Sequence, residues 1–255
     1  GNIGRGFIGA ILSRSGYHVT FADVNMTLID AINAEGRYTV HIQDRDPTAF
    51  TITNIDGISS AGPELAEALK TAECNACMKR IVAAPTAGSC GVLPAVLLPL
   101  WRRGLADETA IHRALYIAAG FGQVVAARAT LAGAEGGCQA EVGAASAMAA
   151  AALVDIRGGT AEQCAEAFAM ALTNLEGLVC DPVAGLVEIP CIKRNVIGAM
   201  NAVSAADMAL AGVVGHIPAD EVIDAMAEVG NAMSQELRET GIGGLAGTPT
   251  EIGRA

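Results

Sequence analysis

Three cysteines, Cys138, Cys180 and Cys191, are the residues of this chain best suited to chemistry. Cys138 and Cys191 each stand at the start of a predicted helix, where the helix dipole and free backbone N–H groups favour a thiolate. Cys180 lies between them in a turn-rich loop, residues 179–185 (VCDPVAG). Three thiolates without a fourth cysteine or histidine suit an iron–sulfur cluster with one open iron better than structural zinc. Such an iron can polarise a substrate hydroxyl as a leaving group.

The same cysteines have a second interpretation, as small buried residues of a helical core. In that case the protein is a non-catalytic helical scaffold, or an inactive subunit. Spacing alone leaves both interpretations open. Cys74 and Cys77 form a C-x-x-C pair, but no second pair of this kind and no histidine pair completes a zinc site. We interpret them as two small residues one turn apart on a buried helix.

Residues 84–91 (APTAGSCG) form a second candidate site, directly before a predicted helix. Glycines and small hydroxyl residues at such a place leave backbone N–H groups free to bind a carboxylate or a phosphate. We therefore predict that Thr86, Gly88 and Ser89 bind substrate. The alternative is a tight turn in which Ser89 caps the following helix.

The first 63 residues differ in pattern from the rest of the chain. Glycines precede a helical run, and a predicted strand, residues 18–23, ends in Asp23. In a dinucleotide-binding arrangement, Gly1 and Gly4 would approach the pyrophosphate and Asp23 would bind the ribose of NAD. The first strand of that arrangement would lie before Gly1, so NAD binding is not expected, and a βαβ fragment without its cofactor is the main interpretation. A further helix over 27–34 and a strand over 38–42 are predicted.

Beyond a junction near residues 61–73, alanine, glycine, valine and methionine dominate the sequence. We predict a mainly α fold in which an alanine-rich helical domain, residues 64–255, surrounds the cysteine site and follows an α/β fragment, residues 1–63. A capping box at Thr160 and Gln163 marks one helix start. The predicted helices cover residues 92–103, 107–131 with a break near 120–122, 141–156, 160–175, 193–213 and 218–233.

Composition favours a helical protein and argues against nucleic-acid-binding and membrane-spanning classes. The 255 residues are 52% hydrophobic but only 4% aromatic, which favours closely packed helices with small contact residues. A net charge of -11 with no basic stripe argues against nucleic acid and anionic membrane as partners. The purest apolar run, residues 144–154, is too short to span a bilayer. With seven cysteines and no signal peptide, we expect a cytoplasmic protein with free or metal-bound thiols.

Two family resemblances refine these expectations. Residues 1 to about 63 resemble the N-terminus of mannitol-1-phosphate 5-dehydrogenases, in residues 1–9 (GNIGRGFIG) and 21–25 (FADVN); an NAD-dependent polyol-phosphate dehydrogenase fragment is thus an alternative. From about residue 73 to 250 the chain resembles the α chain of bacterial iron–sulfur L-serine dehydratases (L-serine ammonia-lyases). The matching runs are residues 84–89 (APTAGS), 136–143 (GGCQAEVG), 177–188 (GLVCDPVAGLVE), 191–195 (CIKRN), 206–212 (ADMALAG) and 237–240 (LRET).

The second resemblance implies a chemistry and a set of partners. It implies a [4Fe-4S] cluster on Cys138, Cys180 and Cys191, whose open iron binds the hydroxyl of L-serine while the loop at Thr86–Ser89 holds its carboxylate. Loss of the α-proton and the hydroxyl then gives pyruvate and ammonia, a step of serine catabolism and gluconeogenesis that needs no pyridoxal phosphate. Lys193 is a candidate catalytic residue, with a surface lysine as the alternative. The family also implies a serine dehydratase β chain, a homo-oligomer, or both.

Overall fold

The computed structural model describes residues 13, 19–23, 26–42, 48–53, 55–59, 63–77, 79, 83–183 and 188–252. The chain divides into two compact units, Gly1–Gly62 and Pro63–Ala255. Helices dominate the described residues, as the sequence predicts for a mainly α protein. In the described part of the chain, no helix is both long enough and apolar enough to cross a bilayer.

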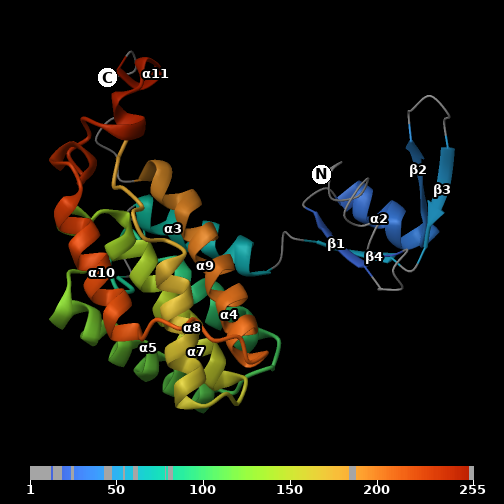
Figure 1. The fold of residues 1–255 in the computed structure, drawn as a ribbon, viewed down its shortest axis with the longest axis horizontal. Coiled ribbons are helices and arrows are strands. Elements are labelled where there is room, and N and C mark those ends of the chain that lie inside the picture. Colours follow the sequence, from blue (N-terminus) through green and yellow to red (C-terminus); the bar gives the residue numbers. More distant parts are fainter. Residues whose placement is uncertain are drawn as a thin grey trace. The chain divides into compact units, whose positions relative to one another are not determined.

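The first unit is a small α/β arrangement (Figure 1). Its elements are β1 (Val19–Asp23), α2 (Met26–Glu35), β2 (Tyr38–Ile42), β3 (Thr48–Ile52) and β4 (Ile55–Ser59). Strand β1 pairs in parallel with β4, and β2 pairs with β3 in an antiparallel hairpin. Ile32, Ile52 and Ile55 form its buried apolar cluster.

This pairing corrects the expectation of a simple βαβ fragment. In a dinucleotide-binding unit the strands before and after a helix are parallel members of one sheet. Here β2, the strand after α2, pairs with β3 in an antiparallel hairpin, and β1 pairs in parallel with β4. Asp23 ends β1 as predicted, whereas Gly1 and Gly4 lie outside the described residues. NAD binding at these three residues therefore stays the alternative interpretation that the sequence leaves open.

The second unit is helical. Its elements are α3 (Pro63–Ala76), α4 (Val92–Arg102), α5 (Glu108–Arg128), α6 (Gly133–Gly136), the π-helical turn η2 (Gln139–Gly143), α7 (Ala144–Ile156), α8 (Ala161–Thr173), α9 (Glu188–Leu210), α10 (Ala219–Ala232), the 3₁₀ turns η3 (Gln235–Leu237) and η4 (Gly244–Gly247), and α11 (Pro249–Ile252).

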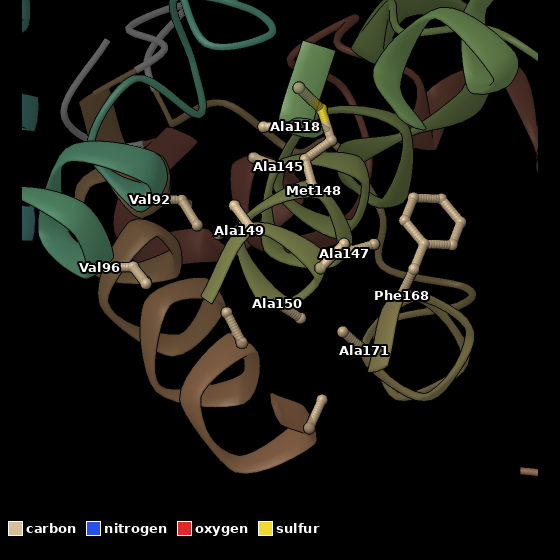
Figure 2. Close-up of a cluster of buried hydrophobic side chains, with 14 of the residues drawn as sticks. Val92, Val96, Ala118, Ala145, Ala147, Met148, Ala149, Ala150, Phe168 and Ala171 are labelled. Carbon is tan, nitrogen blue, oxygen red and sulfur yellow. The ribbon is translucent and has the colours of Figure 1, made fainter. Parts of the chain in front are cut away.

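Helix α7 is the centre of this unit. Every residue from Ala144 to Val154 is buried, and α7 packs against α4, α5, α8 and α9. A helix that is apolar on all sides has no solvent face, and its alanines let neighbouring helices approach closely. Figure 2 shows alanines of α7 among side chains of the surrounding helices, including Val96 and Phe168. This agrees with the expectation of a core built from small contact residues.

The structure confirms one helix feature predicted from the sequence and contradicts another. The capping box is present as predicted, because the Thr160 hydroxyl accepts from Gln163 N and the Gln163 side chain accepts from Thr160 N. The predicted break near residues 120–122 is wrong, since α5 runs without interruption from Glu108 to Arg128. Gly122 lies against the end of the Met148 side chain, and a Cβ atom there would lie 2.8 Å from its methyl group, so Met148 would have to move to accommodate a larger residue.

Candidate functional site

The three predicted ligand cysteines lie together in the second unit. Cys138 directly precedes η2, Cys180 is in the loop after α8, and Cys191 is in the first turn of α9. All three side chains are buried, and the sulfurs of Cys180 and Cys191 both hydrogen-bond with that of Cys138. Three segments far apart in sequence therefore bring their thiols to one point.

The three thiols titrate differently, and Cys138 is the one whose pKa is lowered. Hydrogen bonds from Cys180 and Cys191, together with the nearby Arg194 charge, lower the pKa of Cys138 to about 3 despite its burial. Hydrogen bonding to that thiolate, with burial, raises the pKa of Cys180 and of Cys191 well above the usual range. A buried thiolate is expensive unless it is paired, so the cluster of sulfurs depends on Arg194.

Arg194 also fixes the loop that carries Cys180. Its guanidinium donates to the Val179 carbonyl at 2.8 Å and lies 2.8 Å from Asp181 Oδ1. The other oxygen of Asp181 accepts from the backbone N–H of Leu245 at 2.9 Å. One buried ion pair therefore connects the start of α9, the Cys180 loop and the C-terminal segment.

The backbone around Cys138 and Cys180 is held on both sides. Gln139 donates to the Met226 carbonyl in α10 and accepts from the backbone N–H of Gly177. Gly137 has φ of 74°, a conformation that favours glycine, and a Cβ atom there would lie 2.8 Å from the Leu178 carbonyl oxygen. Cys180 exchanges backbone hydrogen bonds with the C-terminal segment, donating to the Leu237 carbonyl and accepting from Glu239 N.

The loop before α4 is organised around Ser89. The Ser89 hydroxyl is buried and lies 3.1 Å from the Thr86 hydroxyl. The expectation that Ser89 caps the next helix is wrong, because the N-cap of α4 is Gly91 and no side chain caps it. Ser89 instead stabilises the loop from inside. Among the described residues, the backbone N–H groups of Ala87, Gly88 and Ser89 donate to no protein acceptor.

Asn195 joins this loop to the cysteine site. Its side-chain amide is buried and donates to the carbonyls of Gly88 and Cys191, while its oxygen accepts from Gly91 N at 2.8 Å. Both N–H donors of the amide and its oxygen are thus directed at two segments. The Thr86–Ser89 loop and the first turn of α9 are therefore positioned together.

Glu141, in η2, brings a carboxylate to the same place. The side chain is only 7% exposed, and its Oε2 atom has no hydrogen-bond partner. A Cβ atom on Gly88 would lie 3.1 Å from both carboxylate oxygens, and one on Gly133 would lie 2.6 Å from Oε2 and 3.3 Å from Cys180 Sγ. Burial raises the pKa of Glu141 to about 7; a Thr86 hydrogen bond opposes this, and the Cys138 and Glu239 charges add to it.

Sequence reasoning missed Glu141, Arg194 and Asn195, although all three fall inside the quoted runs. The available signal was chemical, because Glu141 is a carboxylate in an otherwise apolar stretch of residues 140–154 that includes only one hydroxyl before Asp155. Lys193 lies two residues beyond Cys191, but its side chain is exposed. Its catalytic role therefore stays a prediction.

The described residues contain no group of three or more His, Cys, Asp or Glu side chains arranged to hold a metal ion. The cysteine sulfurs instead contact each other around Cys138. The assignment of Cys138, Cys180 and Cys191 as metal ligands therefore stays a prediction. So does the assignment of Thr86, Gly88 and Ser89 to substrate.

Comparison with known proteins gives one consistent family. Residues 28–246 match the family described as "Serine dehydratase alpha chain". A Latilactobacillus sakei protein named "Probable L-serine dehydratase, alpha chain" is 60% identical over 185 residues, which cover 72% of this chain and 88% of the relative. A Bacillus subtilis protein of the same name is 56% identical over 76% of this chain and 66% of its own length. "L-serine dehydratase TdcG" of Escherichia coli is 44% identical, and the match spans 40% of that protein.

Proposed function

This chain belongs to the serine dehydratase alpha chain family, and on that premise we propose that it is the α part of an L-serine ammonia-lyase. The reaction converts L-serine to pyruvate and ammonia. The observation that carries the proposal is the meeting of three buried thiols beside the Thr86–Ser89 loop, with Asn195 bonded to both. The proposed amino-acid site and the proposed metal-ligand set would thus adjoin each other.

We propose Cys138, Cys180 and Cys191 as the protein ligands of a [4Fe-4S] cluster. Three buried sulfur atoms with a stable thiolate and an adjacent arginine form a soft, partly charge-compensated donor set. When bound, such a cluster supplies an open iron that acts as a Lewis acid on the substrate hydroxyl. Burial by α9, η2 and the C-terminal segment keeps water from the sulfurs.

The Thr86–Ser89 loop binds the substrate carboxylate in this proposal. Three successive backbone N–H groups, of Ala87, Gly88 and Ser89, donate to no acceptor in the part of the chain that the structure describes, and they suit an anion. Ser89 shapes the loop through its internal hydrogen bonds and does not need to touch substrate. The lack of a side chain on Gly88 lets the Glu141 carboxylate lie directly against the loop.

A serine dehydratase β chain is the partner we propose, with a homo-oligomer as a further possibility. The match to the E. coli L-serine dehydratase covers 40% of that protein, so sequence beyond the α part belongs to such relatives. We also propose a cytoplasmic location, since oxidising compartments convert free thiols to disulfides, and all seven cysteines here are free.

Anaerobic reconstitution with iron and sulfide tests this function. We expect about four irons per chain, visible charge-transfer absorbance, and release of pyruvate from L-serine. A Cys180→Ala variant should lose the absorbance, whereas Cys164→Ala, a buried cysteine of α8 away from the site, should keep it. A coloured but inactive protein that gains activity on addition of a β chain supports the proposed partner. A colourless wild-type protein contradicts the cluster assignment.

A further inference from the structure

We propose that Glu141 binds the α-ammonium group of the substrate and so selects an amino acid over the corresponding hydroxy acid. This inference rests on the proposed function, because it assigns a residue to the substrate of that same site. The inference starts from one buried oxygen atom that lacks a hydrogen-bond partner. Glu141 Oε2 is buried and has no hydrogen-bond partner, and an unpaired buried carboxylate oxygen is costly for a folded protein.

Two glycines line that oxygen closely. A Cβ atom on Gly88 would lie 3.1 Å from both carboxylate oxygens, and one on Gly133 would lie 2.6 Å from Oε2. The positions that these two side chains would occupy form a cradle of about one atom's width beside the carboxylate, the size of an ammonium group. Among the described residues, the titratable groups that act on this carboxylate are Cys138, Cys180, Cys191 and Glu239, while the nearby Arg194 is paired with Cys138 and Asp181. The first four are acidic groups, and none of them supplies the positive partner that Glu141 lacks.

The position of the carboxylate matches the chemistry of an α-amino acid. The free N–H groups of Ala87, Gly88 and Ser89 suit a carboxylate, and the Glu141 carboxylate lies directly beside Gly88. An α-amino acid carries its carboxylate and its ammonium group on one carbon atom, so the two receptors must be neighbours. Cys180 Sγ adjoins the same cradle at Gly133, which places the third substituent toward the cysteines.

Binding an ammonium ion also explains why a buried carboxylate is tolerated here. Its hydrogen bond to Thr86 partly stabilises the negative form, while burial and the neighbouring acids oppose it. A substrate cation adds the missing opposite charge in a site shielded from water, where charge-assisted hydrogen bonds are strong. Glu141 is therefore a binding residue whose partner arrives with the substrate.

The experiment compares two ligands that the enzyme cannot turn over. L-alanine and L-lactate have no leaving group on the β-carbon, and they differ only in carrying an ammonium or a hydroxyl group on the α-carbon. Reconstituted wild-type protein, Glu141→Gln and the control Glu228→Gln, an exposed residue of α10, are titrated calorimetrically with each. We expect the wild type and the control to prefer L-alanine by at least about tenfold, and Glu141→Gln to lose this preference.

If Glu141 has a purely structural role, a different result follows. Glu141→Gln would then lower the affinity for L-alanine and for L-lactate equally, and the ratio of the two affinities would not change. That outcome, or a wild type that releases pyruvate without preferring L-alanine, overturns the inference. Glu141→Asp keeps the negative charge and should retain part of the preference for L-alanine. This variant distinguishes the effect of losing the charge from the effect of disturbing the fold. If the wild type prefers L-alanine through Glu141 but makes no pyruvate with cluster and β chain present, the amino-acid site stands and the proposed reaction is wrong.

Discussion

At the scale of single residues, the site combines two buried charges that the fold treats differently. The Cys138 thiolate is stabilised within the protein by two thiols and Arg194. The Glu141 carboxylate keeps one oxygen without a partner. Proteins retain such unfavourable groups mainly at functional sites, where the cost is recovered on binding. Replacing Glu141 should therefore change the stability of the protein and its binding of substrate in opposite directions, and both can be measured.

We predict that Glu141→Gln stabilises the protein purified without cluster at pH 8. The pKa of Glu141 is raised from 4.5 to about 7 in the folded state, so the native protein binds this proton more tightly than the unfolded chain does. Its contribution to stability is complete below pH 4.5 and is lost as the pH rises through 7. Removing the charge should raise the free energy of unfolding by on the order of 2 kcal/mol at pH 8.

Urea unfolding of both proteins at pH 8 and pH 5 checks this prediction. The difference between them should shrink toward pH 5, where the native carboxyl is already protonated. Glu228→Gln serves as the control, because Glu228 is exposed on α10, and its effect should not change over this range. A variant that is less stable than wild type at pH 8 would contradict the account of Glu141 as an unpaired charge.

At the scale of elements, helix starts and the loops before them carry the site. The first turn of α9 presents Cys191, and the same helix sends Arg194 to the Cys180 loop and Asn195 to the loop before α4. Residues three and four apart lie on one side of a helix, so one turn of α9 positions two other segments. Asn195 is the more informative of the two to change, since its amide bonds only to backbone.

Replacing Asn195 with leucine, which has a similar volume, should lower the free energy of unfolding by about 3 kcal/mol. The change leaves the Gly91 N–H and the carbonyls of Gly88 and Cys191 without their buried partner, at about 1 kcal/mol each. Iron content after reconstitution should fall as well, because Cys191 loses its support. Asn231→Leu, at an exposed position of α10, should change neither quantity; equal effects would show that the interactions of Asn195 are not the cause.

Because helices pack closely around α7, we also predict how a larger residue in this helix changes the free energy of unfolding. Ala149 is fully buried (Figure 2), and leucine there must displace neighbouring helices. We expect Ala149→Leu to cost about 3 kcal/mol in urea unfolding, near the upper end for overpacked cores. Ala127→Leu, on an exposed part of α5, should cost little. Tolerance of leucine at position 149 would mean that α7 is less tightly enclosed than its burial indicates.

At the scale of the whole molecule, the two compact units have separate cores. The larger apolar cluster draws only on residues between Ala68 and Met226, and the smaller one is centred on Ile32, Ile52 and Ile55. The hydrogen bonds described for the cysteine site all join residues of the second unit. The second unit therefore contains both its own core and the proposed chemistry.

Residues 63–255 produced without the first unit should fold and bind the cluster. We expect a thermal midpoint within about 3 °C of the full chain and the same iron content, because separate cores unfold independently. Circular dichroism melts and iron analysis of the two proteins check this. A shortened protein that aggregates, or stays colourless while the full chain is coloured, would show that the first 62 residues support the site.

The sequence by itself determined the helical character of the chain, the capped start of α8 and the alanine-rich centre. These follow from local rules, since helical periodicity, caps and small residues act over a few positions. The set of Cys138, Cys180 and Cys191 came from the family resemblance instead, because spacing alone left it open. Only the tertiary structure decided that β1 pairs with β4, that α5 is unbroken, and that Glu141, Arg194 and Asn195 serve the site. Their roles depend on partners outside their own helical turn: Arg194 donates to Val179, 15 residues away, and Asn195 to Gly88, 107 residues away. No local pattern specifies such contacts.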